Sequence, residues 1–187
     1  DWHAYEEVSD FYVSRKETGG AREIVPFELT WILELFGFPE SVIGSYNKTI
    51  QIKGAEEIDD NYNAILRFKP FTLNMTVDVV SRYATRNLII NCDKGQIRWS
   101  WENNFVSVYS SSSAKWVNHQ FDAGKAHSGY NINISENMYV DEVKAFLAFL
   151  NDDTPFPNTL EKDIKVLDIL NAIEISSDSK KAVEIRK

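Results

Sequence analysis

Hydrophobic residues change their spacing twice along this chain, and that change constrains the fold more than any other feature. The stretches YNAILRF (62–68) and TLNMTVDVV (72–80) alternate apolar and polar residues. A period of two predicts half-buried antiparallel strands. Segments on both sides carry apolar residues at helical spacing instead. Helices that flank a run of strands predict an α+β domain.

The alternation predicts strands from residue 41 to about residue 109, including a hairpin in NLIINCDKGQIRWSW (87–101). Gly95 is expected to supply the positive φ of a tight turn, and Ile97, Trp99 and Trp101 are expected to share a face. We therefore predict a largely antiparallel open sheet with helices packed on one face. Its other face would be available for oligomerisation, since an apolar patch of that size implies a partner.

Four helices are predicted around these strands. YEEVSDFYVSRK (5–16) forms the first, and the second contains Pro26 and ends at Gly37. The second is apolar almost all round, so we expect protein to surround it. The third covers residues 137–150, and Asn158 with Glu161 predicts a capping box for the last. The last helix is expected to bury Leu160, Ile164, Leu167, Leu170 and Ile173.

Composition limits the possible function classes. The chain has 187 residues, 43% of them apolar, which predicts one globular domain over residues 1–187. Its net charge of -8 and the lack of a Lys/Arg block argue against nucleic acid as a partner. Cys92 is the only cysteine, so no internal disulfide can form. No run of 18 apolar residues and no secretory signal occur, which predicts no membrane partner and a cytoplasmic location.

Carboxylates within the second helix are the candidate functional groups. Glu28 falls between Ile32 and Leu35 on a helical wheel, where a carboxylate needs a partner. One interpretation is structural: either an ion pair with Arg15, Lys16 or Arg22, or a partly exposed helix end. The other is a polar group in a substrate cleft.

Several other kinds of site are excluded or weakly supported. The chain lacks a G-x-G-x-x-G or P-loop motif, so it shows no nucleotide phosphate cradle of its own. The three histidines, His3, His119 and His127, do not have metal-ligand spacing. His127 lies in the polar stretch GKAHSGYN, a candidate functional loop whose simpler interpretation is a solvated connection.

Three stretches together resemble the C-terminal domain of the glucose-fructose oxidoreductase and inositol dehydrogenase (Gfo/Idh/MocA) family. They are DFYVSRKETGGAREIVPFELTWILELFG (10–37), NLIINCDKGQIRW (87–99) and YVDEVKAFLAFLNDDTPFPNTLEKDIKVLDILNAIEISSDSKKAVEI (139–185). The resemblance implies an enzyme whose N-terminal Rossmann domain, absent from this chain, binds NAD or NADP. This domain would then hold a sugar, inositol or related polyol and form a homo-oligomer through its sheet.

The resemblance also implies site residues. Counted back from Gly37, the family's D-x-x-x-H-x-x-D pattern falls on Glu23, Phe27 and Thr30, so the first carboxylate is kept and the histidine is replaced. Glu23 and Glu28 are the implied catalytic carboxylates, and a register shift of one residue would bring Glu28 nearer the histidine position. The resemblance places Arg15, Lys16, Arg22 and Tyr139 near the substrate cleft, and the residues themselves add Trp31 and His127 as candidate substrate contacts.

Two functions are compatible with these residues. The first is the substrate-binding and oligomerisation domain of an NAD(P)-dependent sugar or polyol dehydrogenase, expected to be inactive alone. The second is a non-catalytic binding or assembly module in which Phe27 and Thr30 mark lost chemistry.

Overall fold

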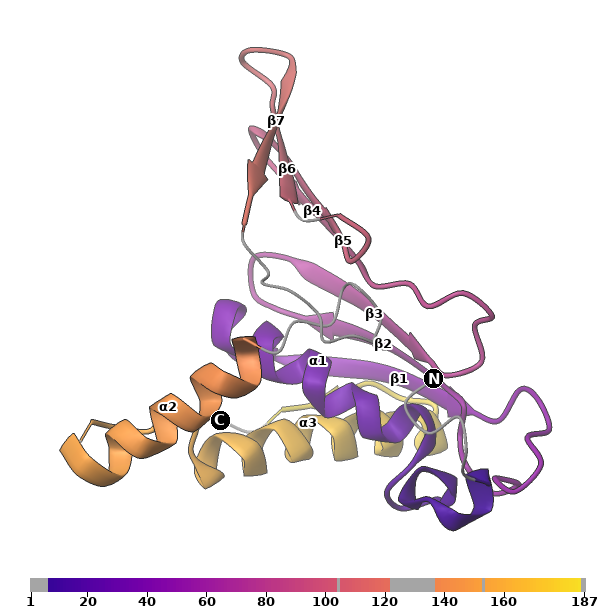
Figure 1. The fold of residues 1–187 in the computed structure, drawn as a ribbon. Coiled ribbons are helices and arrows are strands. Elements are labelled where there is room, and N and C mark those ends of the chain that lie inside the picture. The colour runs from indigo at the N-terminus through magenta and orange to yellow at the C-terminus, as the bar shows by residue number, and fades with distance from the viewer. Residues whose placement is uncertain (1–6, 104, 122–136, 153, 186–187) are drawn as a thin grey trace. The chain divides into compact units, whose positions relative to one another are not determined.

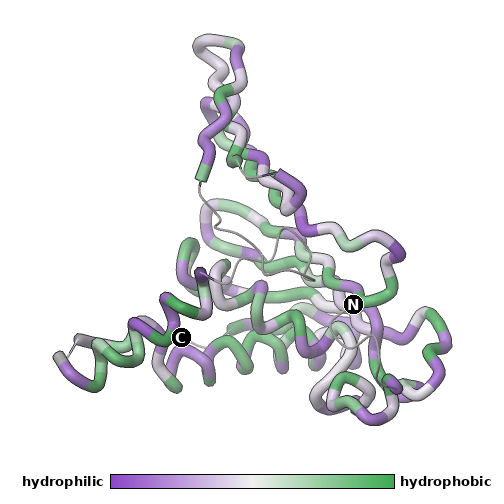
Figure 2. The backbone as a smooth tube through the Cα atoms, in the orientation of Figure 1, coloured by the Kyte–Doolittle hydropathy of each residue, from purple (hydrophilic) through white to green (hydrophobic). Residues whose placement is uncertain are grey.

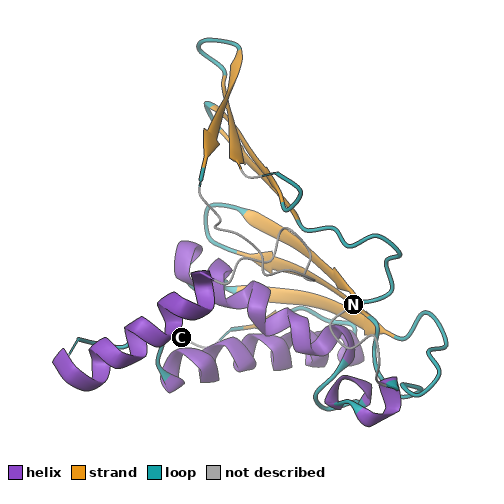
Figure 3. Ribbon diagram, viewed as in Figure 1, coloured by secondary structure: helices purple, strands orange, loops and turns teal. Residues whose placement is uncertain are grey.

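The computed structural model describes residues 7–103, 105–121, 137–152 and 154–185. They form two compact units, one containing residues 7–80 and 158–185 and the other the described residues between 81 and 157. The predicted α+β class is confirmed, since antiparallel open sheets and helices make up the fold (Figure 3). The strands form two four-stranded sheets where one sheet was expected. The single domain over residues 1–187 stays a prediction.

The first unit contains a sheet of order β3-β2-β1-β8. Its strands are β1 (Ser41–Asn47), β2 (Asn61–Arg67), β3 (Thr72–Asp78) and β8 (Val183–Glu184), all antiparallel to their neighbours. The alternation predicted for residues 62–68 is confirmed, because Tyr62, Ala64 and Leu66 are buried while the residues between them are exposed. The C-terminal strand β8 pairs with β1 through Val183 opposite Val42.

Two helices, α1 (Gly20–Phe36) and α3 (Leu160–Ser179), pack on this sheet (Figure 1). The core between helices and strands is formed by buried aliphatic side chains, among them Val25, Leu29, Val42, Leu66, Ile169 and Ile173. Hydrophobic residues recur along both helices and the strands that they contact (Figure 2). The apolar face of the sheet is therefore buried by segments that lie more than a hundred residues apart in the chain.

Gly44 allows α3 to approach β1 closely. A Cβ atom at this position would overlap the backbone carbonyl oxygen of Ile173. The Gly44 N–H donates to the Ser176 hydroxyl oxygen at 2.9 Å, and that hydroxyl donates to the Lys181 carbonyl oxygen at 2.6 Å. Ser176 is buried, so these bonds satisfy its polar atom inside the core.

The second unit contains a sheet whose strands pair in chain order. They are β4 (Asn87–Cys92), β5 (Gly95–Ser100), β6 (Phe105–Ser110) and β7 (Lys115–Gln120). The same unit contains helix α2 (Asn137–Asp152), which confirms the third predicted helix. By the strand register, one sheet face carries mainly apolar residues, namely Leu88, Ile90, Ile97, Trp99, Val106, Val108 and Val117.

The predicted hairpin is confirmed, but its glycine has a different role. Cys92 pairs with Gly95 across the turn, and Gly95 is not among the glycines with positive φ. A Cβ atom on Gly95 would instead overlap the Tyr109 carbonyl oxygen of the neighbouring strand. Trp101 lies beyond the end of β5, so it does not share that strand with Ile97 and Trp99.

Two helix predictions are corrected. Within the predicted first helix, the described residues form only 3₁₀ turns, η1 (Val8–Asp10) and η2 (Tyr12–Ser14), because the nearby Gly19 and Gly20 let this segment fold back on the start of α1. In α3, Leu160, Ile164 and Leu167 are exposed. Leu170 and Ile173 are buried as predicted, and Val166, Ile169 and Ser176 complete the buried stripe.

Two finer predictions also differ from the structure. The side chain that caps α3 belongs to Thr159, whose hydroxyl accepts from the Lys162 N–H at 3.3 Å, and Asn158 bonds Asp163 instead. Helix α1 is not surrounded within its unit, since Phe27 is 63% and Leu35 is 66% exposed. A helix on a single sheet needs apolar residues on one side only, so its other apolar side remains uncovered there.

Candidate functional site

A pair of glycines fixes the start of α1. Gly20 has a φ of +64°, a value that favours glycine, and a Cβ there would overlap the Asp59 carbonyl oxygen. A Cβ on Gly19 would overlap the backbone of Val13. These close approaches place the segment containing η2 beside the first turn of α1.

The outward side of α1 is the side that faces away from the sheet. It carries the three positions on which the D-x-x-x-H-x-x-D pattern falls. Glu23, Phe27 and Thr30 are spaced four and three residues apart, so they share one side of the helix. Phe27 and Thr30 are exposed, and the Thr30 hydroxyl donates to the Pro26 carbonyl oxygen at 2.8 Å. This side is opposite the buried residues Val25, Leu29 and Ile32, and therefore faces away from the sheet.

Glu23 is engaged by Tyr12 of η2. The Tyr12 hydroxyl donates to Glu23 Oε1 at 2.6 Å, and Tyr12 is 50% exposed. This hydrogen bond raises the pKa of the Tyr12 phenol. Sequence reasoning did not identify Tyr12 as a partner of Glu23. No spacing rule connects it with Glu23 across the glycine pair.

Glu28 is engaged by Trp31. The indole Nε1–H donates to Glu28 Oε2 at 2.7 Å, one helical turn away. Glu23 and Glu28 are five residues apart, which separates them by roughly 140° around the helix axis. The two predicted catalytic carboxylates therefore lie on different parts of the α1 surface. Each is held by its own aromatic partner.

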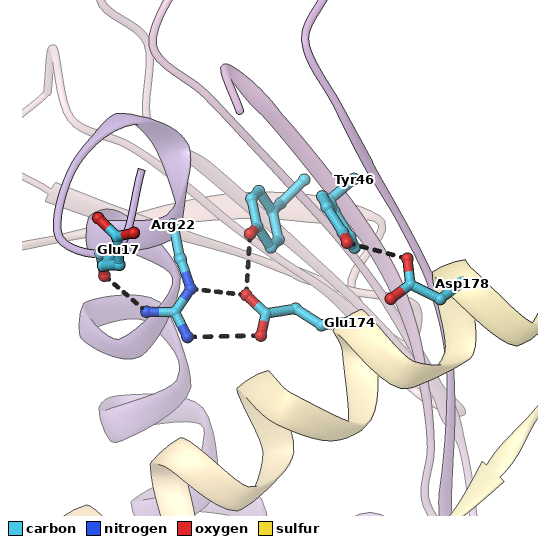
Figure 4. A network of polar contacts seen from close by, with 6 residues as sticks. Glu17, Arg22, Tyr46, Glu174 and Asp178 are labelled. Atoms are coloured by element: carbon cyan, nitrogen blue, oxygen red, sulfur yellow. Dashed lines mark hydrogen bonds and ion pairs between the residues drawn. The ribbon is translucent and has the colours of Figure 1, made fainter. Parts of the chain in front are cut away.

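Arg22 lies within a polar network on the inner side of α1 (Figure 4). Its Nε–H donates to Glu174 Oε1 at 2.7 Å, and its other nitrogens contact Glu174 Oε2 and the Glu17 carbonyl oxygen. The Tyr62 hydroxyl also donates to Glu174 Oε1, at 3.0 Å. Burial, reinforced by the Glu174 charge, raises the pKa of the Tyr62 phenol. The network ties α1, α3 and β2 together.

A second tyrosine and carboxylate pair extends this network. The Tyr46 hydroxyl donates to Asp178 Oδ1 at 2.9 Å, and this bond raises the pKa of Tyr46 to about 12. The Tyr46 and Tyr62 rings are stacked, with centroids 5.3 Å apart. Sequence reasoning did not identify Glu174 or Asp178, because their partners are more than a hundred residues away.

The remaining predicted substrate contacts belong to different segments of the chain. Arg15 and Lys16 are exposed in the connection between η2 and α1. Burial raises the pKa of Asp59, and the Lys16 charge opposes that shift. Tyr139 lies in α2, in the second unit. His127 lies outside the described residues.

Neither a metal centre nor a membrane segment is found in the part of the chain that the structure describes. No group of three or more His, Cys, Asp or Glu side chains there could hold a metal ion. None of the described helices combines the length and the apolar character needed to cross a membrane.

The fold is shared with solved oxidoreductases. No protein-family model matches the chain, and no curated protein matches it. Levoglucosan dehydrogenase, solved with NADH and levoglucosan, aligns with a TM-score of 0.74 at 15% identity, over 94% of this chain and 53% of that one. An oxidoreductase domain protein from Kribbella flavida aligns with a TM-score of 0.72 at 16% identity, over 90% of this chain and 50% of that one.

A further structure of levoglucosan dehydrogenase, with NADH and L-sorbose, aligns with a TM-score of 0.73 at 15% identity, over 90% of this chain and 50% of that one. The chain therefore spans about half the length of the solved structures that it matches. At these identities the likeness shows the fold alone. That fold is the one found in part of these oxidoreductases, which is consistent with the resemblance noted in the sequence.

Proposed function

We propose that this chain is the substrate-binding and subunit-associating half of an NAD(P)-dependent oxidoreductase of the Gfo/Idh/MocA type. Its substrate would be a sugar, inositol or related polyol, oxidised or reduced by hydride transfer. The shared fold with levoglucosan dehydrogenase, solved with NADH and levoglucosan, supports this proposal. So does the observation that the chain spans about half of that protein.

The observation that carries the proposal is the outward side of α1. It presents an ordered carboxylate, Glu23, beside the exposed ring of Phe27. An exposed apolar ring next to a carboxylate suits a surface that a second domain covers, because burial of apolar area favours association. The covering domain in this proposal is the N-terminal Rossmann domain of the same full-length protein.

NAD or NADP would be held mainly by that Rossmann domain. The sequence of this chain has no glycine-rich phosphate loop, whereas its carboxylates suit the hydroxyl groups of a polyol. When bound, the nicotinamide accepts or donates the hydride. The residues of this chain bind and orient the substrate, and they handle the hydroxyl proton.

Each predicted site residue has a place in this proposal. Glu23 and Glu28 bind substrate hydroxyls or take up the proton, and Trp31, fixed by Glu28, offers its ring to a sugar face. Arg22 supports the site through Glu174. The other predicted contacts with the substrate are Arg15, Lys16, His127 and Tyr139.

Association between subunits would use the apolar sheet face of the second unit. Leu88, Ile90, Ile97 and Trp99 on that face are each partly exposed. A sheet face of this composition favours a protein partner over water. A second copy of the chain is the partner that we propose.

The alternative is a non-catalytic binding or assembly module. Phe27 favours this alternative. It occupies the histidine position of the family pattern, and a phenyl ring cannot exchange a proton. In that case the outward side of α1 would serve only to bind another protein or domain.

Activity of the full-length protein separates these functions. NADH or NADPH formation is followed with a panel of polyols and sugars, comparing wild type with Glu28→Gln and Glu23→Gln. Glutamine at position 28 can still accept the Trp31 hydrogen bond, so that variant removes the charge alone. Glu40→Gln, an exposed carboxylate beyond α1, is the matched control. Formation of reduced cofactor by wild type supports the dehydrogenase, and none with any substrate supports the binding module.

A further inference from the structure

Tyr12 of η2 and Glu23 on the outward side of α1 bring together a hydroxyl, which can both donate and accept a proton, and a carboxylate acceptor. We propose that this pair relays the substrate's hydroxyl proton to solvent. The inference rests on the proposed function and names residues that would carry out its proton step.

The geometry of the pair suits proton transfer. The oxygen-to-oxygen distance of 2.6 Å is that of a charge-assisted hydrogen bond. Tyr12 is half exposed, so its hydroxyl oxygen can still accept a hydrogen bond from a substrate hydroxyl. Glu23 is only partly buried, which leaves a route for its proton to reach water.

Backbone hydrogen bonds fix the turn that carries Tyr12. The Tyr12 carbonyl oxygen accepts from the Thr18 hydroxyl at 2.9 Å and from the Arg15 N–H at 3.1 Å. The Gly19 N–H donates to the Arg15 carbonyl oxygen at 2.8 Å and joins this turn to the start of α1. A donor fixed on a rigid turn keeps its geometry without further ordering when a substrate binds.

The neighbouring residues cannot replace this pair. Trp31 also donates to a carboxylate, but an indole N–H is a donor only and cannot accept a proton in exchange. Phe27 has no exchangeable proton. Of the three aromatic residues Tyr12, Phe27 and Trp31, only Tyr12 can both give and accept a proton. The relay is therefore assigned to Tyr12 and its partner Glu23.

The proton step balances as follows. The alcohol carbon would become a carbonyl as its C–H bond breaks, and the hydride would pass to the oxidised nicotinamide that the proposed function supplies. The hydroxyl proton passes to the Tyr12 oxygen, while the proton of Tyr12 moves to Glu23. Tyr12 begins and ends as a neutral phenol, which agrees with the raised pKa that its bond to Glu23 causes. Glu23 then releases its proton to water.

The test uses the full-length protein with a polyol that it oxidises. Tyr12→Phe and Glu23→Gln should each lower kcat by about 100-fold or more, the lower range for a lost acid-base group, while KM changes much less. The double variant should be no slower than the slower single variant, since the two residues act as one unit. Tyr83→Phe, which removes another exposed tyrosine bonded to a glutamate, Glu102, should keep wild-type kcat.

A second measurement is independent of activity. In the Glu23→Gln variant the ionisation of Tyr12, followed by NMR of its labelled ring carbon, should move to lower pH, because the glutamate bond raises that pKa. An unchanged Tyr12 titration would overturn the pairing. An active wild type with an equally active Tyr12→Phe would overturn the relay alone. A wild type inactive with every substrate and both cofactors would overturn the proposed function together with the relay.

Discussion

Arg22 and Glu174 lie 152 positions apart in the chain and are joined by a hydrogen bond of 2.7 Å between Nε and Oε1. This contact links α1 to α3, and the Tyr62 hydroxyl on the same carboxylate oxygen adds β2. The bond raises the pKa of Arg22 even though partial burial opposes the shift. An ion pair as well as apolar packing therefore holds α1 against α3 and the sheet.

Replacing Glu174 tests how much that network contributes to the free energy of unfolding. Glu174→Gln leaves the Arg22 charge without its partner and should lower the free energy of unfolding by about 1–3 kcal/mol, measured by urea denaturation. Glu34→Gln is the control, because it breaks the exposed ion pair with Lys162 and should cost about 0.5 kcal/mol or less. Equal losses in both variants would contradict a special role for the Glu174 network.

Gly44→Ala tests the close packing of α3 on β1. The added methyl group would overlap the Ile173 carbonyl oxygen, so the helix has to move away from the sheet. We expect a loss of at least about 1–3 kcal/mol, typical of an overpacked core, in thermal or urea unfolding. An alanine variant as stable as the wild type would mean that α3 and β1 are farther apart than described.

Asp60 gives the chain a stability that depends on pH. Burial alone would raise its pKa, but bonds from the Ile50 and Thr49 backbone N–H groups and the Thr49 hydroxyl hold it below its ordinary value. A folded pKa below the unfolded one contributes stability above the unfolded value, about 3.9 for Asp. That contribution is lost as the pH falls through the folded pKa.

Asp60→Asn should therefore be less stable than the wild type at pH 7, and the difference should shrink as the pH falls below about 4. Urea unfolding at a series of pH values measures it. Glu57→Gln, an exposed carboxylate in the same loop, serves as the control. A stability difference for Asp60→Asn that stays constant from pH 7 to pH 3 would contradict the ionised, hydrogen-bonded carboxylate.

Local patterns in the sequence predicted most of the regular elements. The period of two in residues 62–68 and 72–80 identified β2 and β3, because alternate residues of a strand pack on one core. The two apolar stripes of α3 could not be ranked in the same way. Leu160 and Ile164 suit a core as well as Val166 and Ile169 do, and only the packing on β1 determines which stripe is buried.

The candidate site was predicted only in part. The carboxylates of α1 stood out because they interrupt an apolar helix, which is a local signal. Their partners did not stand out. Tyr12 meets Glu23 through a turn that Gly19 and Gly20 permit, and Glu174 meets Arg22 across the whole fold. Contacts that depend on backbone approach or on tertiary packing leave no spacing pattern in the sequence.

The outward side of α1 also predicts how an isolated chain behaves. Phe27 is 63% exposed, so Phe27→Ser should leave the unfolding free energy of this chain within about 0.5 kcal/mol of wild type. In the full-length protein the same change should lower the melting temperature, if the Rossmann domain covers that ring. If Phe27→Ser leaves the stability of both proteins unchanged, the Rossmann domain does not contact Phe27.

The most direct test of the account follows the hydride itself. The full-length protein is given oxidised NAD or NADP and a panel of polyols carrying deuterium at the reacting carbon, and the reduced cofactor is analysed by mass spectrometry. We predict deuterium on the nicotinamide with at least one substrate, and a rate lowered by about 100-fold in Glu23→Gln. Absence of deuterated cofactor with every substrate, from a folded wild-type protein, would contradict the proposal that this chain is part of a dehydrogenase.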